Sequence, residues 1–337
     1  MSAAGEVLVT GGTGIVGGAV LRELTAAGRT VRALVRSTAS GDRVAALGAQ
    51  PVDGDVMDRT TLKDAAKGVD SIFHMAGKNA FCLRDPSELF RVNVHGSVNV
   101  VRAAADAGVK RVVYTSSAAT VGEHKGARGD EDAPHRGWFL SEYERSKFDA
   151  EVEVLKEATR LGVDVVCVNP SSVQGPGRAG GTGKVLVAYL RGKLRLFVDT
   201  RVSLVDIKDC ARGHLLAEER GTPGRRYILN GATLTTGELL ALVGEMTGLH
   251  HSPRIVPSHV ATAGAGVVEI VFGLRRKDAP VCREMVRTML HGHRYDGSRA
   301  ARELRLSYTP IEETIRRTIA WLIDEGLAPR PPGFMNP

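Results

Sequence analysis

Residues 10–18 carry the sequence Thr10-Gly-Gly-Thr-Gly-Ile-Val-Gly-Gly18, and this stretch decides the fold. It follows the short apolar run Val7–Val9, which predicts a buried strand. It precedes residues 19–27, whose apolar spacing predicts an amphipathic helix. A strand that leads through a glycine loop into a helix is typical of a pyrophosphate site, because the first amides of the helix are free to bind an anion.

The three spaced glycines of this loop explain how a phosphate could come so close. Gly11 permits a tight turn after the strand, Gly14 lets a phosphate approach the backbone, and Gly17 lets the helix pack closely on the strand. The other contacts in the loop are expected from Thr13, Ile15 and Val16. The pattern therefore predicts a dinucleotide site, although its spacing is G-x-x-G-x-x-G and not G-x-G-x-x-G.

Apolar, β-branched runs recur along the chain, with helical patterns between them. The predicted strands are residues 7–9, 31–35, 51–53, 71–74, 112–115, 163–168 and 227–229. The predicted helices are residues 17–27, 60–67, 88–107 and 146–161. This alternation predicts an α/β fold with a doubly wound parallel Rossmann sheet, whose ligands bind beyond the carboxyl ends of the strands.

The sequence pattern changes after residue 170. Residues 175–183 are rich in glycine, and beyond residue 231 the pattern is mainly helical. We expect a nucleotide-binding domain made of residues 1–170 and 201–230, with segment 201–230 returning to the sheet. A smaller, mainly helical substrate lobe is expected from residues 171–200 and 231–328. Residues 329–337 are expected to form a loose tail.

The composition narrows the class of protein. The 337 residues are 43% hydrophobic and 25% charged, as in soluble globular proteins, and carry a net charge of +7. The basic residues are spread along the chain, so we expect no nucleic-acid partner. The four cysteines lack C-x-x-C spacing, which predicts neither a disulfide framework nor a metal site and favours a reducing cytoplasm.

Residues 260–274 are the most membrane-like segment of the chain. They number 15 and include Glu269, so they are too short to span a bilayer. We expect a buried helix here, with a surface membrane anchor as the alternative.

Residues at the ends of the second, third and fourth predicted strands indicate the cofactor. Arg36 stands where NAD-binding proteins usually place an acid for the ribose hydroxyl, and a guanidinium suits a 2′-phosphate instead. NADP(H) is therefore favoured, and NAD(H) remains possible. Asp55 can accept from the adenine amino group while Val56 covers the ring, and the small Ala76 lets the backbone pass beside the cofactor.

Two hydroxyls and a Tyr–Lys pair indicate catalysis. The fifth strand ends in Ser116 and Ser117, and a helix that Ser141 and Glu144 could cap carries Tyr143 and Lys147 four residues apart on one face. A nearby ammonium stabilises a phenolate, so we expect the pKa of Tyr143 to fall toward neutrality. Such a tyrosine can exchange a proton with a carbonyl or an alcohol.

Together these residues resemble the extended branch of the short-chain dehydrogenase/reductase superfamily. The resemblance covers the chain to about residue 325 and includes residues 10–18, 54–58, 74–77, 92–96, 114–118, 143–147, 169–176 and 204–209. Within that branch the chain is most similar to the dihydroflavonol-reductase-like group, which includes bacterial proteins labelled hopanoid-associated sugar epimerases.

The resemblance implies a role for each matching residue. Tyr143 is implied as the proton donor or acceptor, and Lys147 as the residue that holds the nicotinamide ribose. Ser117 is implied to bond the reacting oxygen, and Asn93 to take part in a proton relay. Pro170 and Val173 are implied to line the nicotinamide pocket. The resemblance also implies a homodimer that packs helices around residues 93–107 and 141–160.

The sequence thus predicts an NAD(P)-dependent oxidoreductase that moves hydride between nicotinamide and a small-molecule carbonyl or secondary alcohol. One alternative is a sugar-nucleotide epimerase or dehydratase that oxidises its substrate transiently. Such epimerases usually carry a Tyr before the glycine that follows the serine, whereas residues 118–122 are Ala-Ala-Thr-Val-Gly. The other alternative is a non-catalytic cofactor sensor, a class that commonly lacks the Tyr–Lys pair.

Overall fold

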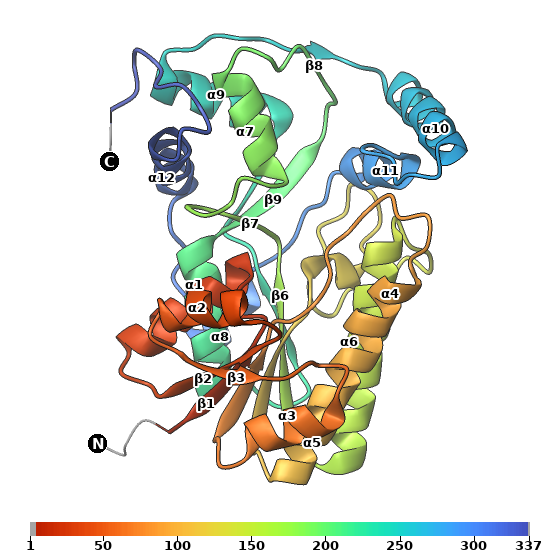
Figure 1. Ribbon diagram of the computed structural model, residues 1–337. Coiled ribbons are helices and arrows are strands. Elements are labelled where there is room, and N and C mark those ends of the chain that lie inside the picture. Colours follow the sequence, from red (N-terminus) through yellow and green to blue (C-terminus); the bar gives the residue numbers. More distant parts are fainter. Residues whose placement is uncertain (1–4, 336–337) are drawn as a thin grey trace.

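Seven parallel strands form the central sheet of the computed structural model, which describes residues 5–335 (Figure 1). In spatial order the strands are β10 (Arg226–Leu229), β6 (Asp164–Pro170), β5 (Arg111–Thr115), β4 (Ser71–His74), β1 (Val7–Thr10), β2 (Val31–Val35) and β3 (Gln50–Asp53). The predicted doubly wound parallel sheet is confirmed. The strand order reverses between β1 and β4, where sheets of this kind bind their ligands.

Strand β1 shows why helices cover both faces of the sheet. Val7 and Val9 point into one apolar core and Leu8 into another, and all three side chains are fully buried. The helices over the first core are α1 (Ile15–Ala26), α2 (Thr38–Ala45) and α8 (Ile207–Arg220). Those over the second are α3 (Arg59–Ala66), α5 (Ser97–Ala107) and α6 (Glu142–Leu161). A strand that is apolar at every position fits only such a three-layer arrangement.

Two short helical turns bring site residues into place. The predicted helix 88–107 is divided into α4 (Ser87–Phe90), the π-helical turn η1 (Arg91–Gly96) and α5. After β5 the chain makes the 3₁₀ turn η2 (Ala118–Val121). π-turns inside helices often mark functional positions, and here the turn contains Asn93.

The C-terminal half builds the second lobe above the sheet (Figure 1). Its strands are β7 (Ser172–Gln174), β9 (Arg201–Asp206) and β11 (Ala232–Thr235), which form one sheet, and β8 (Leu196–Phe197) and β12 (Arg254–Ile255), which form another. Its helices are α7 (Thr182–Leu190), α9 (Thr236–Thr247), α10 (Ser258–Leu274), α11 (Arg283–His291), η3 (Ala300–Leu304) and α12 (Ile311–Asp324). Within segment 201–230, β10 returns to the central sheet as expected, whereas β9 joins the separate three-stranded sheet.

Helix α10 contradicts the expectation of a buried helix. Ile270 is 58% exposed and Leu274 is 82% exposed, and the buried residues of the helix are Ala265 and Gly266. The helix packs against α11 at the outer edge of the second lobe (Figure 1). Its uniformly apolar sequence gave no sign of which side would be covered. Among residues 5–335, no helix combines the length and the hydropathy needed to cross a membrane.

The described part of the tail is also not loose. Phe334 is only 5% exposed and packs in the core formed by α7, α9 and α12, while the Gly333 amide donates to the Thr247 carbonyl at 3.3 Å. Burial of the Phe334 ring therefore orders a segment whose proline-rich composition had suggested a loose tail. Residues 336 and 337 lie outside the described residues.

A disulfide between Cys82 and Cys282 corrects the prediction made from cysteine spacing. The two residues are 200 positions apart in sequence, and their Cα atoms lie 5.5 Å apart. The second lobe brings the start of α11 against the loop that follows β4, a proximity that no local spacing can reveal. Cys167 and Cys210 are buried free thiols.

Candidate active site

The glycine loop between β1 and α1 is packed so tightly that side chains are excluded at two positions. Gly11 has a φ of +75°, and a Cβ there would lie 2.5 Å from the Ala76 nitrogen. A Cβ on Gly17 would lie 2.1 Å from the Gly11 carbonyl oxygen. Gly11 therefore fits the loop against the end of β4, and Gly17 lets α1 pack on the loop, as the sequence predicted.

The start of α1 has the properties of an anion site. Gly14 is the N-cap residue and supplies no capping side chain, so the first amides of the helix are not bonded by it. Thr13, Gly14 and Ile15 are exposed to solvent, and Val16 is partly buried. Open amides and a positive helix end fit the pyrophosphate of a dinucleotide.

Arg36 and Asp55 meet at the carboxyl ends of β2 and β3. The Arg36 side chain is 76% exposed, and its Nη1 lies 3.8 Å from Asp55 Oδ2. Asp55 Oδ1 accepts from the Met57 amide at 2.9 Å, which fixes the turn after β3. Val56 is buried beside this pair, and the Ala76 amide donates to Thr10 Oγ1 at 3.3 Å. The structure thus brings Arg36, Asp55 and Val56, which the sequence assigned to the adenosine half of the cofactor, to the same edge of the sheet as Ala76.

Ser117 lies at the catalytic end of β5 and meets Tyr143. Its Oγ accepts from the Ala119 amide at 3.3 Å and caps η2, and its side chain lies close enough to Tyr143 to oppose the rise in the pKa of that phenol. The neighbouring Ser116 hydroxyl is buried and has no hydrogen-bond partner among residues 5–335. Of the two adjacent hydroxyls, Ser117 is therefore the one that influences the tyrosine.

The pKa of Tyr143 moves in the direction opposite to the one expected. Burial raises the pKa of the phenol, while the hydrogen bond with Ser117 and the charge of Arg178 oppose that rise. Lys147 does not take the role of lowering it, because its ammonium is turned toward other partners. The prediction assumed that residues four apart on a helix converge, and it did not allow for desolvation of the phenol.

Lys147 is a buried cation with partners on β5. Its Nζ donates to the Thr115 carbonyl at 2.9 Å and to the Tyr114 hydroxyl at 3.1 Å. Burial lowers the pKa of Lys147 to about 8, and the nearby Glu151 carboxylate opposes that shift. The side chain is therefore held at the carboxyl end of the strand and remains mostly charged at neutral pH.

A buried polar network supports Lys147 and Ser117 from behind. Asn169 Nδ2 donates to Glu151 Oε2 at 2.6 Å and to Thr120 Oγ1 at 3.0 Å. It also lies 3.2 Å from the Ser117 carbonyl oxygen. This amide joins the end of β6 to η2 and α6. Pro170 ends β6 and Val173 lies in β7, and both are buried directly beyond the network.

Asn93 is fully buried and uses its side-chain amide as a clamp. Its Oδ1 accepts from the Lys78 amide at 2.7 Å. Its Nδ2 donates to the Lys78 carbonyl at 3.0 Å and to Ser146 Oγ at 2.9 Å. The π-turn therefore ties the loop after β4 to the residue that precedes Lys147.

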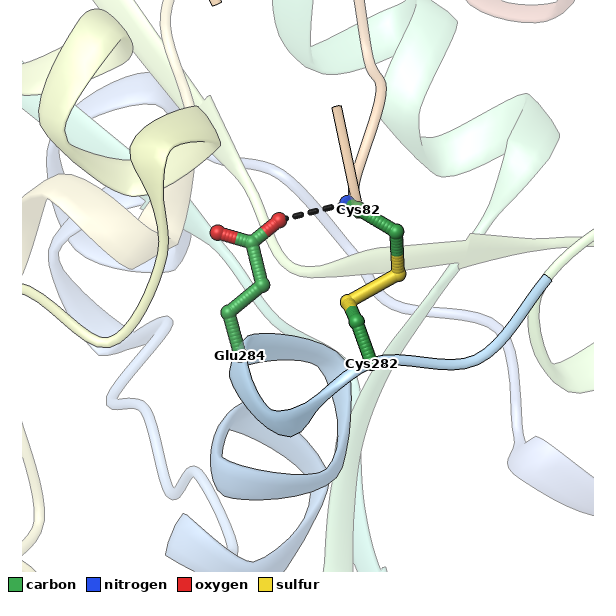
Figure 2. Close-up of side chains that lie close together, drawn as sticks. All are labelled: Cys82, Cys282 and Glu284. Atoms are coloured by element: carbon green, nitrogen blue, oxygen red, sulfur yellow. Dashed lines mark hydrogen bonds between the residues drawn. A yellow bond between two sulfur atoms is a disulfide. The ribbon is translucent and has the colours of Figure 1, made fainter. Parts of the chain in front are cut away.

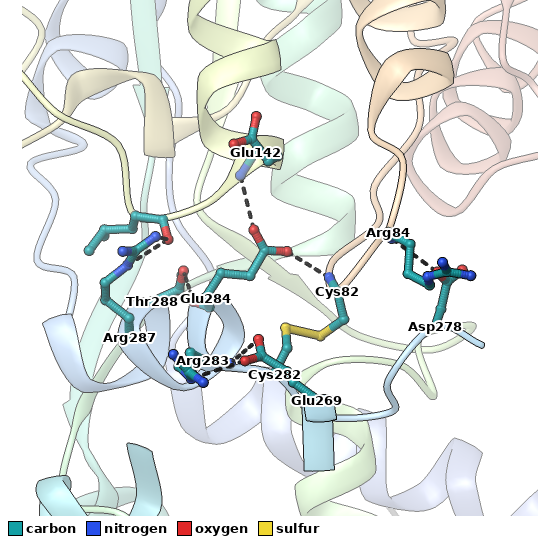
Figure 3. Close-up of a disulfide and its surroundings, with 11 residues drawn as sticks. Cys82, Arg84, Glu142, Glu269, Asp278, Cys282, Arg283, Glu284, Arg287 and Thr288 are labelled. Atoms are coloured by element: carbon teal, nitrogen blue, oxygen red, sulfur yellow. Dashed lines mark hydrogen bonds and ion pairs between the residues drawn. A yellow bond between two sulfur atoms is a disulfide. The ribbon is translucent and has the colours of Figure 1, made fainter. Parts of the chain in front are cut away.

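Helix α11 closes over the start of α6 through Glu284. One carboxylate oxygen of Glu284 accepts from the Cys82 amide at 2.6 Å, and the other accepts from the Glu142 amide at 3.1 Å (Figures 2 and 3). The Phe81 ring beside Cys82 lies 5.5 Å from the Tyr143 ring, centre to centre. The disulfide and Glu284 thus fix a loop that contacts Tyr143, and sequence reasoning missed both.

Glu123, His291 and His293 gather where the end of α11 meets the chain after η2. Their ligand atoms lie within 4.8 Å of one another, a spacing that could hold a cation. His293 Nδ1 lies 2.6 Å from Glu123 Oε1, and His291 Nε2 lies 3.1 Å from the Glu123 carbonyl oxygen. Burial raises the pKa of Glu123, but hydrogen bonds from both histidines outweigh it and lower the pKa to about 2. The histidines thus serve as partners for a buried carboxylate.

Comparison with known proteins decides the family. Residues 7–229 match the family described as "NAD dependent epimerase/dehydratase family". The chain belongs to this family. It is accordingly an NAD(P)-dependent oxidoreductase, as the sequence predicted.

Relatives of this epimerase/dehydratase family member include both reductases and a sterol-modifying protein. The chain is 35% identical to "Putative dihydroflavonol 4-reductase" of Synechocystis sp., over 94% of each protein. It is 33% identical to "Sterol demethylase protein B" of Methylococcus capsulatus, over 95% of this chain and 99% of the other. Among solved structures, gox2253 is 33% identical with a TM-score of 0.83, over 96% of this chain and 99% of that one.

Proposed function

We propose that the protein is an NADP(H)-dependent oxidoreductase that reduces ketones or aldehydes and can oxidise the matching secondary alcohols, with Ser117, Tyr143 and Lys147 at the reacting centre. One observation supports this most directly. Ser117 lies close enough to Tyr143 to affect the pKa of its phenol, and Lys147, one helical turn beyond Tyr143 on α6, donates to the Thr115 carbonyl at the end of β5. A proton donor (Tyr143), a hydrogen-bond donor (Ser117) and a cation (Lys147) thus lie around the place proposed for the reacting carbonyl group.

The cofactor site is proposed from residues at the carboxyl edge of the sheet. Gly11, Gly14 and Gly17 with the amides of Thr13, Ile15 and Val16 would hold the pyrophosphate, and Arg36 would bind a 2′-phosphate. The adenine would lie against Asp55, Val56 and Ala76, and the nicotinamide against Pro170 and Val173. When bound, the nicotinamide cofactor supplies or accepts the hydride.

The protein's own residues move and hold the proton. Tyr143 donates its phenolic proton to the carbonyl oxygen, and Ser117 donates a hydrogen bond to that oxygen as negative charge develops. Because burial raises the pKa of Tyr143, the phenol is protonated at neutral pH, which favours reduction over oxidation. Lys147, held on Thr115 and Tyr114, would bind the nicotinamide ribose, and Asn93 holds the loop and helix that flank the site.

The substrate is proposed to bind to the lobe made of residues 171–200 and 231–328, next to the nucleotide-binding domain of residues 1–170 and 201–230. Arg178 supports this assignment, since it belongs to the lobe and its charge lowers the pKa of Tyr143. A substrate with a negative group beside its carbonyl would suit this arginine.

A homodimer is proposed through α5 and α6. A surface groove of about 350 Å³ lies along α4, η1 and α6, and its apolar lining includes Phe90, Val94, Phe148 and Val152. A cytoplasmic location remains a prediction from the sequence.

The function is tested by supplying ketones, aldehydes and secondary alcohols with NADPH, NADH and their oxidised forms, and following the absorbance of the reduced nicotinamide. We expect net consumption of NADPH with a carbonyl substrate. An epimerase would convert sugar nucleotides without net consumption of added cofactor, and that result would overturn the proposal. The Arg36→Asp variant is expected to shift the cofactor preference toward NADH, and an unchanged preference would refute the role given to Arg36.

A further inference from the structure

Helix α10 is arranged with its apolar side outward. Its exposed large residues are Val260, Val267, Ile270, Val271 and Leu274, and Ala263 and Gly264 lie exposed between them. These positions recur at three- and four-residue intervals, which places them along one face of a helix. A face this long without a polar side chain is unusual on a protein surface and marks an interaction site.

The opposite face of α10 is already occupied by α11. Gly266 lies so close to α11 that a Cβ there would be 2.7 Å from Arg283 Nε. Glu269, the one acidic residue of α10, forms an ion pair with Arg283 at 3.1 Å and accepts from its amide at 2.8 Å (Figure 3). The helix therefore turns its carboxylate toward the protein and its aliphatic side chains toward solvent.

A cluster of positive charge lies at the end of the same helix. Arg275, Arg276 and Lys277 follow Leu274 directly, and all three are exposed. The acid that comes next, Asp278, accepts from the Arg84 amide at 3.1 Å (Figure 3). Residues 254–277 contain four Arg or Lys residues and a single acid, which is Glu269. An apolar face beside exposed cations complements a binding partner that has an apolar interior beneath an anionic surface layer.

We propose that α10 docks on a lipid bilayer that contains anionic lipids. The helix lies flat at the interface, with Val267, Ile270 and Leu274 below the headgroups and the cluster Arg275–Lys277 among the lipid phosphates. At 17 residues the helix is about 25 Å long and does not span the hydrocarbon core. A second copy of the chain would fit this face less well. In a symmetric contact between two α10 helices, Arg275–Lys277 would meet no unpaired acidic residue, because Glu269 already pairs with Arg283.

Vesicle co-sedimentation of the full-length protein tests the proposal. We expect binding to mixed phosphatidylcholine and phosphatidylglycerol vesicles, and much weaker binding to pure phosphatidylcholine. The double variant Val267→Asp with Ile270→Asp is expected to lose binding by about tenfold or more. Its matched control is Met335→Asp, which changes an exposed apolar residue near the C-terminus and is expected to bind as the wild type does.

The contribution of charge is tested by the triple variant Arg275→Gln, Arg276→Gln and Lys277→Gln. We expect it to bind mixed vesicles at least about tenfold more weakly. Its control changes the same number of exposed cations elsewhere, at Arg43, Lys63 and Lys156, and is expected to keep its affinity. Equal losses in the two triple variants would contradict docking through α10.

Two further results would overturn the proposal. The first is a wild-type protein that does not sediment with mixed vesicles. The second is a wild-type protein that is dimeric and does not bind vesicles, together with a Val267→Asp and Ile270→Asp double variant that is monomeric. The apolar face of α10 would then be the contact between two copies of the chain. An unchanged midpoint of thermal unfolding shows that a variant remains folded. If the double variant does not fold, the milder Ile270→Gln variant is used in its place.

Discussion

Helices α6 and α10 both depart from the usual pattern of a surface helix, in which apolar residues are buried and charged residues are exposed. Helix α6 buries charged residues, namely Glu144, Lys147, Glu151 and Glu157, whereas α10 exposes a row of aliphatic ones. Each buried charge on α6 has a partner, among them the Arg136 guanidinium for Glu144 and the Thr115 carbonyl for Lys147. The exposed aliphatic residues of α10 face solvent. Departures from polar-outside patterning therefore mark the reacting centre on one helix and a proposed docking face on the other.

Among the charged residues of α6, the largest effect should follow from removing Lys147, the cation that this helix buries. The Lys147→Met variant keeps most of the side-chain volume but loses the charge beside the reacting centre, so kcat/KM should fall by about 10²–10³-fold. Lys156→Met, an exposed position on the same helix, is the matched control and should behave as the wild type. Steady-state kinetics on both variants makes the comparison, and similar values for Lys147→Met and wild type would refute the role of this cation.

A second test compares the effect of a buried charge and of an exposed charge on α6 on the free energy of unfolding. Arg136 and Glu144 form an ion pair whose side chains are 1% and 3% exposed, and Glu144 also accepts from the Leu140 amide at 2.7 Å. Glu144→Gln leaves a buried guanidinium without its counter-charge, and should lower the free energy of unfolding by about 3 kcal/mol. Glu153→Gln on the same helix, at a position 45% exposed, should change it by about 0.5 kcal/mol or less. Urea denaturation measures both, and equal changes would show that burial of this pair is unimportant.

The smallest of these effects is a pH dependence set by α6. Because burial lowers the pKa of Lys147 to about 8, its charged form predominates below that pH and is lost as the pH rises through it. The reduction rate should therefore be level near neutrality and fall above pH 8, by about tenfold for each further unit. Lys147→Arg should move this fall to higher pH. A rate that rises through pH 8 would contradict the assignment.

The sequence predicted the central sheet correctly because that feature depends on local patterns. The apolar strands, the glycine loop and the Tyr143–Lys147 pair are each contained within a few residues. The Ser141 cap was also predicted, and its Oγ accepts from the Glu144 amide at 3.1 Å. The Glu144 carboxylate, however, turns to Arg136, whose position depends on the fold of the loop that precedes α6.

Features that need two distant segments could not be predicted. The Cys82–Cys282 disulfide, the Glu284 bridge and the Tyr114 contact to Lys147 each depend on how the second lobe or a neighbouring strand is placed. The exposure of α10 was missed for the same reason, because the side of this helix that is covered depends on where α11 packs. The direction of the Tyr143 pKa was missed because desolvation depends on everything that packs around the phenol.

The central claim is that Tyr143 is the proton donor, and the Tyr143→Phe variant tests it most directly. With a carbonyl substrate identified from the panel, kcat/KM for NADPH-dependent reduction should fall by about 10²–10⁴-fold. NADPH should still raise the thermal midpoint of this variant as it does for the wild type, because the phenol does not hold the pyrophosphate. Turnover close to the wild-type rate in a variant that binds NADPH would contradict the mechanism.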